Sequence, residues 1–371
     1  MSDPRRFLIA SWDGGGNTPA AYNLGARLIQ LGHEVRLMGW DTMAGRAAAA
    51  GVDFTTYSSV AHWPEGLAQD DAIDELLKPA ISGRATRDDI LAEAAVFAPD
   101  VMVVDCMLGS GFDAARMLGL PTAVLVHVLY SSFRYEWGSA LMDRDMAPLL
   151  DGAGVTLALV PPGFDAPCPL PANTTYVGPI TAPPNGEHLD QEDVALLATP
   201  GDPWVLISLS TTLQRQATAL PAILEAVAAM PVRVLLTLGG VLPASAIAAP
   251  ANVTVRGFLS HHLVLPHAAA VVCHGGLSTI TAALAAGVPI VCIPQGREQP
   301  INAARVAASG VGKVVATDAP ASEIAATLME LLEDPAGRAE ARRFADVIAG
   351  LGGGDEATRK VVSLVRRPVS I

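Results

Sequence analysis

The sequence predicts an α/β protein built from two doubly wound, parallel-sheet domains that face each other across a cleft. Three observations support this prediction. The 371 residues correspond to two domains of ordinary size. Short apolar runs alternate with stretches of helical periodicity, which is typical of parallel strands joined by crossover helices. The alternation also stops at a proline-rich segment and then starts again.

The first half contains strands that are each followed by a loop and a helix. Its first loop is rich in glycine, and the helix after it carries leucines on one face until Gly32 ends it. The expected elements are a strand over Phe7–Trp12, the loop Asp13–Asn17, a helix from Ala20, strands over Val35–Met38, Val101–Asp105 and Thr122–Val126, and a helix over Asp113–Leu118.

Eight prolines between Pro161 and Pro184 interrupt this pattern. Proline lacks a backbone donor, so we expect neither a helix nor a central strand there, and we interpret the segment as a linker between domains. The pattern then restarts with strands over Trp204–Leu209, Val232–Leu238, Val271–Cys273 and Ile290–Ile293, a helical stretch that reaches Met230, and helices over Ser278–Ala286 and Asn302–Ser309.

Three glycines precede a last helix over Asp355–Arg366, whose acidic start and basic end suit the helix dipole. Such a glycine-rich break in the chain allows the helix to cross back to the first domain. The predicted division is therefore a first domain over residues 1–160, a linker over 161–200, a second domain over 201–350 and a crossing helix within 351–371.

Composition excludes several functional classes. The net charge is −13 and basic residues form no stripe, which argues against a nucleic-acid partner. The longest uncharged stretch, Gly257 to Gly296, contains four histidines and three prolines, so it does not predict a membrane span. No export signal is recognisable at the N-terminus, which makes the cytoplasm the expected location. The four cysteines show no metal-site spacing, so we expect no metal centre.

The most informative motif is His274-Gly275-Gly276, which follows a buried strand and precedes a helix that starts near Ser278. A helix N-terminus after a glycine turn offers unpaired N–H groups and a positive dipole end, which together suit a phosphate. Hydroxyl and imidazole donors add to such a site. An ordinary tight turn with a serine cap is the alternative interpretation.

The surrounding order of residues is more specific. Gly257-Phe258-Leu259-Ser260-His261-His262, the His-Gly-Gly turn, Ala286-Gly287-Val288-Pro289 and Pro294-Gln295-Gly296-Arg297-Glu298-Gln299 follow one another up to Asn302. This segment resembles the donor-binding signature of nucleotide-sugar glycosyltransferases with the GT-B fold, which has two Rossmann-like domains. More narrowly, it resembles the actinobacterial branch that glycosylates antibiotics, including macrolides and calicheamicin.

The resemblance implies roles for matching positions. His274 would bind the donor diphosphate, assisted by Gly276, Ser278 and Thr279, and Thr211 would face the same phosphates. Phe258 and Leu259 would flank the nucleobase. Glu298 and Gln299 would bind sugar hydroxyls, because a carboxylate accepts two hydroxyl protons and an amide both donates and accepts. The alternative for this last pair is an ordinary acidic start of a helix.

The resemblance fails at the expected catalytic base. Relatives carry a histidine in the first glycine loop, whereas Asn17 stands at that position here, and Asn has no useful basic group. The aspartate that pairs with this histidine is matched by Asp105. Asp13, in the same loop, and His127, after the strand Thr122–Val126, are the two replacement candidates, and we favour Asp13 because of its loop. Their alternatives are a turn-initiating aspartate and a buried structural histidine.

The sequence thus suggests an inverting, metal-independent transfer of a hexose or deoxyhexose from a TDP- or UDP-sugar co-substrate, with no cofactor. The acceptor would be a small natural product, aromatic or polyketide, bound through Trp63, Tyr130, Phe133 and Trp137, although such aromatics equally serve as packing. A sugar-nucleotide 2-epimerase and a catalytically silent donor-binding protein remain the alternatives. The oligomeric state is open between a monomer and a homodimer.

Overall fold

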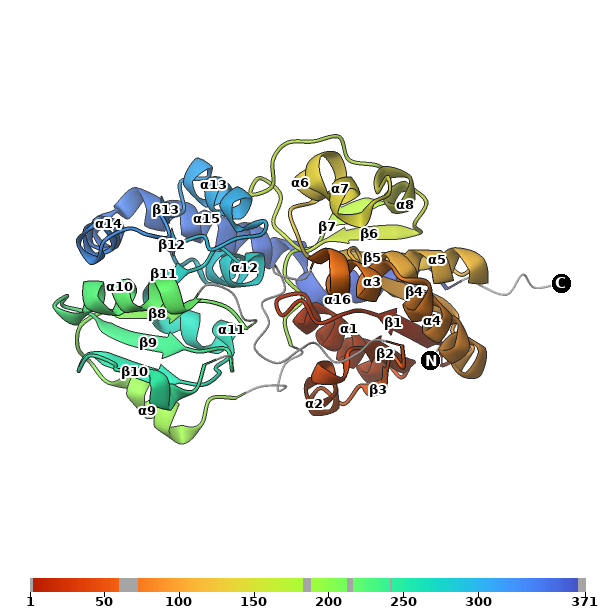
Figure 1. Ribbon diagram of the computed structural model, residues 1–371, viewed down its shortest axis with the longest axis horizontal. Coiled ribbons are helices and arrows are strands. Elements are labelled where there is room, and N and C mark those ends of the chain that lie inside the picture. The colour runs from red at the N-terminus through yellow and green to blue at the C-terminus, as the bar shows by residue number, and fades with distance from the viewer. Residues whose placement is uncertain (1–2, 60–72, 183–187, 212–215, 241, 366–371) are drawn as a thin grey trace. The chain divides into compact units, whose positions relative to one another are not determined.

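The computed structural model describes residues 3–59, 73–182, 188–211, 216–240 and 242–365. These residues form two compact units (Figure 1). Unit 1 contains the first part of the chain through residue 182 together with the C-terminal segment from Leu351. Unit 2 contains the chain from residue 188 to Gly350.

Unit 1 is a seven-stranded sheet of order β3-β2-β1-β4-β5-β6-β7 in which every pairing is parallel. Its strands are β1 (Arg6–Ala10), β2 (Glu34–Gly39), β3 (Asp53–Thr56), β4 (Val101–Asp105), β5 (Thr122–Val126), β6 (Val155–Ala158) and β7 (Thr174–Tyr176). Its helices are α1 (Thr18–Gln30), α2 (Ala44–Ala49), α3 (Lys78–Ser82), α4 (Arg84–Phe97), α5 (Gly109–Leu118), α6 (Tyr130–Ser132), α7 (Gly138–Met142), α8 (Ala147–Asp151) and α16 (Gly353–Val362), with short turns η1 (Asp41–Met43), η3 (Ile73–Leu77) and η4 (Phe133–Trp137).

Both faces of this sheet are buried, as β1 illustrates. Leu8 and Ala10 belong to the hydrophobic cluster that includes α4 and α5, whereas Phe7 and Ile9 belong to the cluster that includes α1 and α16. A parallel strand covered on both faces is apolar throughout rather than alternating, which is why these runs were recognisable in the sequence. The strand order reverses between β1 and β4, and ligand sites of doubly wound sheets form at such points.

The C-terminal helix α16 completes the core of unit 1. It packs against α1 and β6, and its Ala357 and Val361 are fully buried. Arg27 of α1 forms an ion pair with Asp355 in the first turn of α16. A Cβ at Gly354 would lie 2.3 Å from Nε of Arg27, so a larger residue there would displace the Arg27 side chain.

Unit 2 is a six-stranded parallel sheet of order β10-β9-β8-β11-β12-β13. Its strands are β8 (Trp204–Ser208), β9 (Arg233–Thr237), β10 (Val253–Arg256), β11 (Ala268–Cys273), β12 (Ile290–Cys292) and β13 (Gly312–Val314). Its helices are α9 (Gln191–Ala198), α10 (Gln216–Ala228), α11 (His261–Val264), α12 (Leu277–Ala286), α13 (Gln299–Ala308), α14 (Ala321–Glu333) and α15 (Pro335–Leu351, which extends one residue beyond the unit), with short turns η5 (Ala244–Ala246) and η6 (Leu265–His267).

The predicted fold class, two doubly wound parallel sheets, is confirmed. One predicted helix start was wrong. The helix after β4 begins at Gly109 rather than Asp113, and its first turn includes Gly111, where a Cβ would lie 2.7 Å from Val104. As expected, the proline-rich segment forms neither a helix nor a central strand over residues 161–182; it contributes β7, which lies at the sheet edge, where a strand tolerates nearby prolines.

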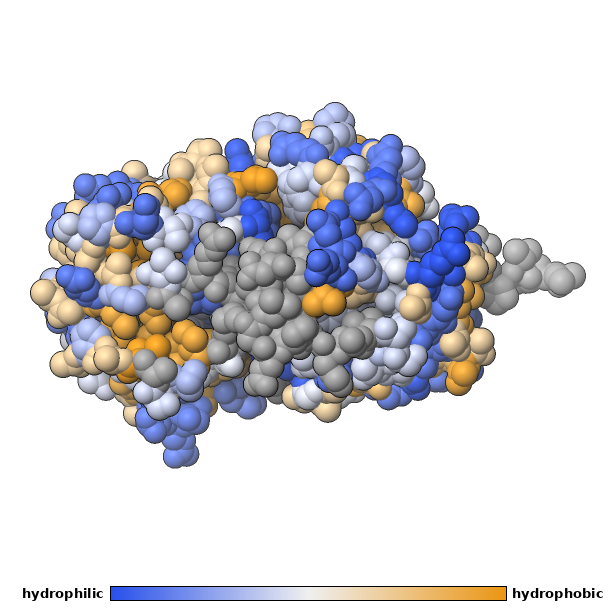
Figure 2. All heavy atoms as spheres, viewed as in Figure 1, coloured by the Kyte–Doolittle hydropathy of each residue, from blue (hydrophilic) through white to orange (hydrophobic). Residues whose placement is uncertain are grey.

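The surface in Figure 2 shows hydrophilic residues over both units, interrupted by smaller hydrophobic areas. Among the described residues, no helix is both long and apolar enough to cross a membrane. The long uncharged stretch from Gly257 forms β11, α12 and β12 together with their loops, and strands β11 and β12 are buried in the sheet of unit 2.

We predict that Val361→Ala lowers the free energy of unfolding by about 2 kcal/mol, because it removes buried methyl groups from the α16 contact. Thermal unfolding of the purified variant measures this change. Arg359→Ala is the matched control, since Arg359 lies on the same helix but is exposed and forms a surface ion pair with Glu356. Equal midpoints for both variants would contradict the role assigned to α16.

Candidate functional site

The His-Gly-Gly turn lies at the carboxyl end of β11 in unit 2. Gly275 has φ +88°, a backbone conformation that favours glycine, and Gly276 is the N-cap of α12. Ser278, in the first turn of α12, is exposed, whereas Thr279 is buried. The N–H groups of this first turn lack helical partners, so the turn has the local geometry of an anion site.

The ring of His274 packs over the start of α12. A Cβ at Gly276 would lie only 2.4 Å from Nε2 of His274, which explains why glycine occupies an otherwise ordinary backbone conformation of φ −65° and ψ 131°. His274 is 8% exposed, and no described residue provides a hydrogen-bond partner for its Nδ1. A buried polar atom of this kind is costly unless a ligand or water satisfies it.

Burial is the main reason why the pKa of His274 is lowered to about 4. Coulombic interactions with His261 and Arg297 lower the pKa further, while a hydrogen bond with the backbone of Ser208 raises it. The imidazole is therefore neutral at pH 7. It can donate one N–H to a phosphate oxygen, but it brings no charge of its own in the unliganded protein.

A second loop, between β12 and α13, is tied to the His-Gly-Gly turn. Nδ2 of Asn302 donates to the carbonyl oxygen of Gly275 at 3.0 Å, and Asn302 is fully buried. Oε1 of Gln299 accepts the backbone N–H of Gln295 at 2.8 Å. Glu298 is half-buried at the N-cap of α13, whereas Gln299 is 1% exposed. The predicted sugar-binding pair thus adjoins the predicted phosphate site, with the Gln299 oxygen engaged inside its own loop.

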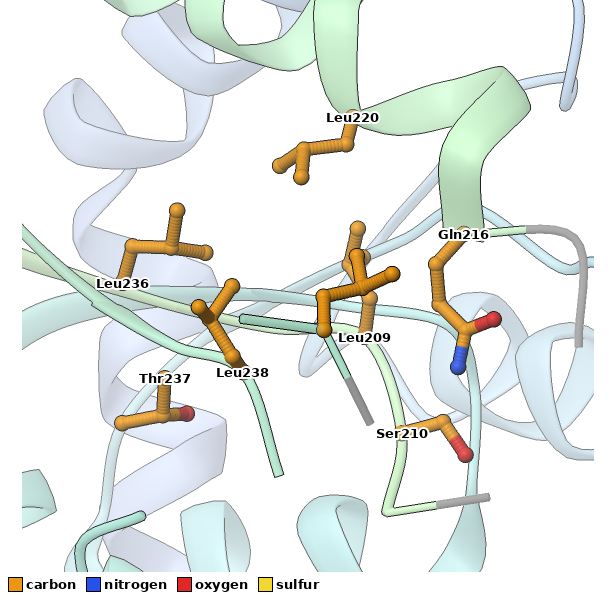
Figure 3. A pocket seen from close by; sticks show the side chains of 8 residues that line it. Leu209, Ser210, Gln216, Leu220, Leu236, Thr237 and Leu238 are labelled. Carbon is orange, nitrogen blue, oxygen red and sulfur yellow. The ribbon is translucent and has the colours of Figure 1, made fainter. Parts of the chain in front are cut away.

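The remaining predicted donor residues lie in two other loops of unit 2. Thr211 follows Ser210, which has an unusual φ of +140°. Phe258 is 55% exposed after β10, and Leu259 beside it is half-buried. The structure also has a small hollow that sequence patterns did not predict, at the ends of β8 and β9, where Ser210, Gln216 and Thr237 are the polar residues and leucines form the rest of the lining (Figure 3).

In unit 1, the carboxylate of Asp105 at the end of β4 is the centre of a buried hydrogen-bond cluster. Asp105 is 3% exposed and accepts four hydrogen bonds. Its partners are Nε1 of Trp12 at 3.1 Å, Nδ2 of Asn17 at 2.8 Å, the backbone N–H of Met107 at 2.9 Å, and Nε2 of His127 at 3.1 Å. Burial raises the pKa of this carboxyl, but His127 and the hydrogen bonds outweigh burial and hold the pKa below its ordinary value.

Asn17 stands where a histidine was expected, and it links the glycine loop to Asp105. Its Nδ2 donates both to Asp105 and to the carbonyl oxygen of Trp12, and its Oδ1 accepts the N–H of Gly14 at 3.0 Å. The amide preserves a donor to Asp105 and fixes the glycine loop. It has no basic group with which to take a proton.

His127 is mostly buried, and its ring forms a hydrogen bond with the same carboxylate. Burial by itself would lower the pKa of His127, but Asp105 and Cys106 raise it well above its ordinary value. The ligand atoms of Asp105, Cys106 and His127 lie within 4.8 Å of one another, a grouping that sequence spacing missed because the residues come from two strands. Because Asp105 already accepts four N–H groups, the arrangement is better suited to hydrogen bonding than to holding a metal ion.

Asp13 occupies the glycine loop and is half-buried. Its two carboxylate oxygens accept the N–H of Gly15 at 3.1 Å and the hydroxyl of Thr42 at 2.6 Å. A carboxylate oxygen can accept more than one hydrogen bond, so these two contacts do not use the full acceptor capacity of Asp13.

The aromatic residues predicted to bind an acceptor differ in exposure. Tyr130 and Phe133 are fully buried in the core of unit 1, which agrees with the packing alternative. Trp137 is half-buried and makes an edge-on contact with Phe133, with ring centroids 5.3 Å apart. Trp63 lies outside the described residues.

Comparison with known proteins shows what the chain is similar to. Residues 221–364 match the family model for the erythromycin biosynthesis protein CIII-like C-terminal domain. The chain is 26% identical to 4'-demethylrebeccamycin synthase of Lentzea aerocolonigenes, over 93% of this chain and 96% of the relative. It is 42% identical to demethyllactenocin mycarosyltransferase of Streptomyces fradiae, over 30% of this chain and 24% of the relative.

Two solved structures show the fold of the whole chain. A calicheamicin glycosyltransferase has a TM-score of 0.78 and 25% identity, covering 99% of this chain and all of that one. A Streptomyces sp. SF2575 glycosyltransferase complexed with thymidine diphosphate has a TM-score of 0.73 and 21% identity, covering 97% and 99%. The protein is therefore a glycosyltransferase with the GT-B fold. Its second half carries the erythromycin biosynthesis protein CIII-like domain, and the chain as a whole is similar to glycosyltransferases of antibiotic pathways.

We predict that Gly276→Ala weakens nucleoside-diphosphate binding by about tenfold or more, because the added methyl group displaces the ring of His274. Calorimetric titration with TDP measures the effect. Gly257→Ala is the control, since a Cβ there meets nothing within 4 Å. In a His274→Ala background, Gly276→Ala should have little further effect, and an undiminished additional loss would show that the clash with His274 is not its cause.

Proposed function

We propose that this glycosyltransferase moves a hexose or deoxyhexose from a TDP- or UDP-sugar to a small natural-product acceptor, with inversion and without a metal cofactor. The observation that supports this most is the His-Gly-Gly turn, where Nδ1 of the neutral, buried His274 has no hydrogen-bond partner among the described residues and lies beside the N-terminus of α12. This arrangement suits a diphosphate, which the leaving nucleotide contains.

We favour a donor sugar that is linked to thymidine diphosphate. The Streptomyces sp. SF2575 neighbour is complexed with thymidine diphosphate, and the Streptomyces fradiae relative is named for transferring a mycarosyl group. Phe258 and Leu259 remain the residues proposed to flank the base, and the exposed Phe258 ring offers a stacking face. Glu298 and Gln299 remain proposed for the sugar.

The proposed reaction is a single displacement. The acceptor oxygen bonds to the anomeric carbon, the bond from that carbon to the diphosphate breaks, and the diphosphate takes the electron pair. A base removes the acceptor proton. We assign this base to Asp13 rather than to His127, because a histidine whose pKa is raised is already protonated near neutral pH and cannot take a proton. Asp105 then acts as the buried centre that fixes the glycine loop.

A donor-binding protein without transferase activity is the second candidate. Asn17 favours it, since all the polar atoms of its amide are engaged within unit 1 and none is basic. In that case, nucleotide binding would persist while no acceptor consumed the donor. The two candidates therefore share the unit 2 site and differ in the chemistry of unit 1.

We predict that calorimetry detects binding of TDP or UDP in the presence of a chelator, with GDP binding more weakly. His274→Ala should reduce the affinity by about tenfold or more, the scale expected when a hydrogen bond to a charged group is lost. Binding should also strengthen as the pH falls toward the lowered pKa of His274, about 4, because the protonated imidazole attracts the diphosphate more strongly than the neutral ring does. Failure of all three nucleotides to bind would refute the donor assignment.

We predict that Asp13→Asn reduces turnover by about a hundredfold or more, the range for loss of a general base, with TDP affinity unchanged. His127→Gln keeps an N–H donor for Asp105 and should retain most of the activity. If His127 were instead the base, wild-type turnover would rise with pH through its raised pKa and His127→Gln would abolish that rise. Such a result would transfer the base assignment to His127.

A further inference from the structure

Arg297 has a backbone conformation that its position in the fold does not otherwise require. Four described non-glycine residues have positive φ. Ala98 and Asp143 are the C-caps of α4 and α7, where left-handed residues are ordinary. Ser210 and Arg297 instead follow β8 and β12 at the carboxyl edge of the unit 2 sheet, and Arg297 has φ +54°. Backbone strain of this kind concentrates at functional sites.

The loop that carries Arg297 is fixed against the His-Gly-Gly turn. Strands β11 and β12 are neighbours with Cys273 opposite Cys292, and the N–H of Ile293 donates to the carbonyl oxygen of Cys273 at 2.8 Å. A Cβ at Gly275 would lie 3.2 Å from the carbonyl oxygen of Gln299, two residues after Arg297. The starts of α12 and α13 therefore lie side by side, with Arg297 in the half-buried turn that precedes α13.

The positive charge of Arg297 suits binding of an anionic nucleotide. His274 is neutral at pH 7, and the whole chain carries a net charge of −13, so an anionic nucleotide needs a local cation. The positive charge of Arg297 is close enough to contribute to lowering the pKa of His274, after burial and His261. A guanidinium with two parallel N–H groups matches the geometry of two phosphate oxygens.

We propose that Arg297 binds the β-phosphate of the nucleotide and neutralises the charge that develops there as the sugar leaves. The β-phosphate is the assigned group because it bears the sugar, and Arg297 directly precedes the proposed sugar-binding pair Glu298 and Gln299. When the bond between the anomeric carbon and the β-phosphate oxygen breaks, its electron pair goes to that oxygen, and the acceptor supplies the new bond. This role rests on the proposed transferase function.

The test compares TDP, which has a β-phosphate, with TMP, which lacks one. In Arg297→Gln, the affinity for TDP should fall by about tenfold or more, while the affinity for TMP stays within about twofold, because only TDP loses a charge-assisted contact. Arg297→Lys should recover part of the lost TDP affinity. Arg305→Gln, which removes the same charge from the last turn of α13, is the matched control and should leave the ratio of the two affinities unchanged.

Arg297→Gly separates binding from folding. Glycine adopts φ +54° without strain, so this variant should unfold at an unchanged or higher temperature while losing TDP affinity as Arg297→Gln does. Equal losses for TDP and TMP, or an unchanged TDP-to-TMP ratio in Arg297→Gln and Arg297→Gly, would overturn the inference while leaving the donor assignment intact. Absence of TDP binding by the wild-type chain would instead refute the proposed function.

Discussion

Burial of two parallel sheets on both faces is the constraint on which the rest of this structure depends. It makes each strand an apolar run and leaves the carboxyl ends of the strands as the place where polar side chains gather. Asp105 ends β4 and His274 follows β11, while Asp13 and Arg297 stand in the loops after β1 and β12. The low proportion of charged residues, 16%, is a consequence of the same burial.

The two units use buried polar groups in opposite ways. In unit 1, Asp105 satisfies four donors at once, so its charge stabilises the loop and holds His127 in the protonated form. In unit 2, His274 is kept neutral by burial, and no described residue forms a hydrogen bond with its Nδ1. A fully satisfied cluster provides rigidity, whereas an unsatisfied group beside a helix N-terminus provides a place for a ligand.

The sequence alone predicted the structure correctly where a single local pattern of residues determines it. The strands Val101–Asp105 and Thr122–Val126 were predicted with their observed bounds, and the His-Gly-Gly turn was recognised from its own residues. The sequence alone did not predict features that depend on contacts between residues distant in the chain. The bonds from Asn17 and His127 to one carboxylate join three segments of the chain, and the edge strand β7 forms only because β6 offers it a partner. The burial of Tyr130 and Phe133 likewise depends on tertiary packing that aromatic content alone does not reveal.

The central claim is that the start of α12 receives the diphosphate of a sugar nucleotide. A crystal structure of the chain with bound TDP tests it most directly. The account predicts phosphate oxygens within hydrogen-bond distance of the backbone N–H groups in the first turn of α12 and of a ring nitrogen of His274. A TDP molecule bound to the chain with its diphosphate away from both α12 and His274 would contradict the account.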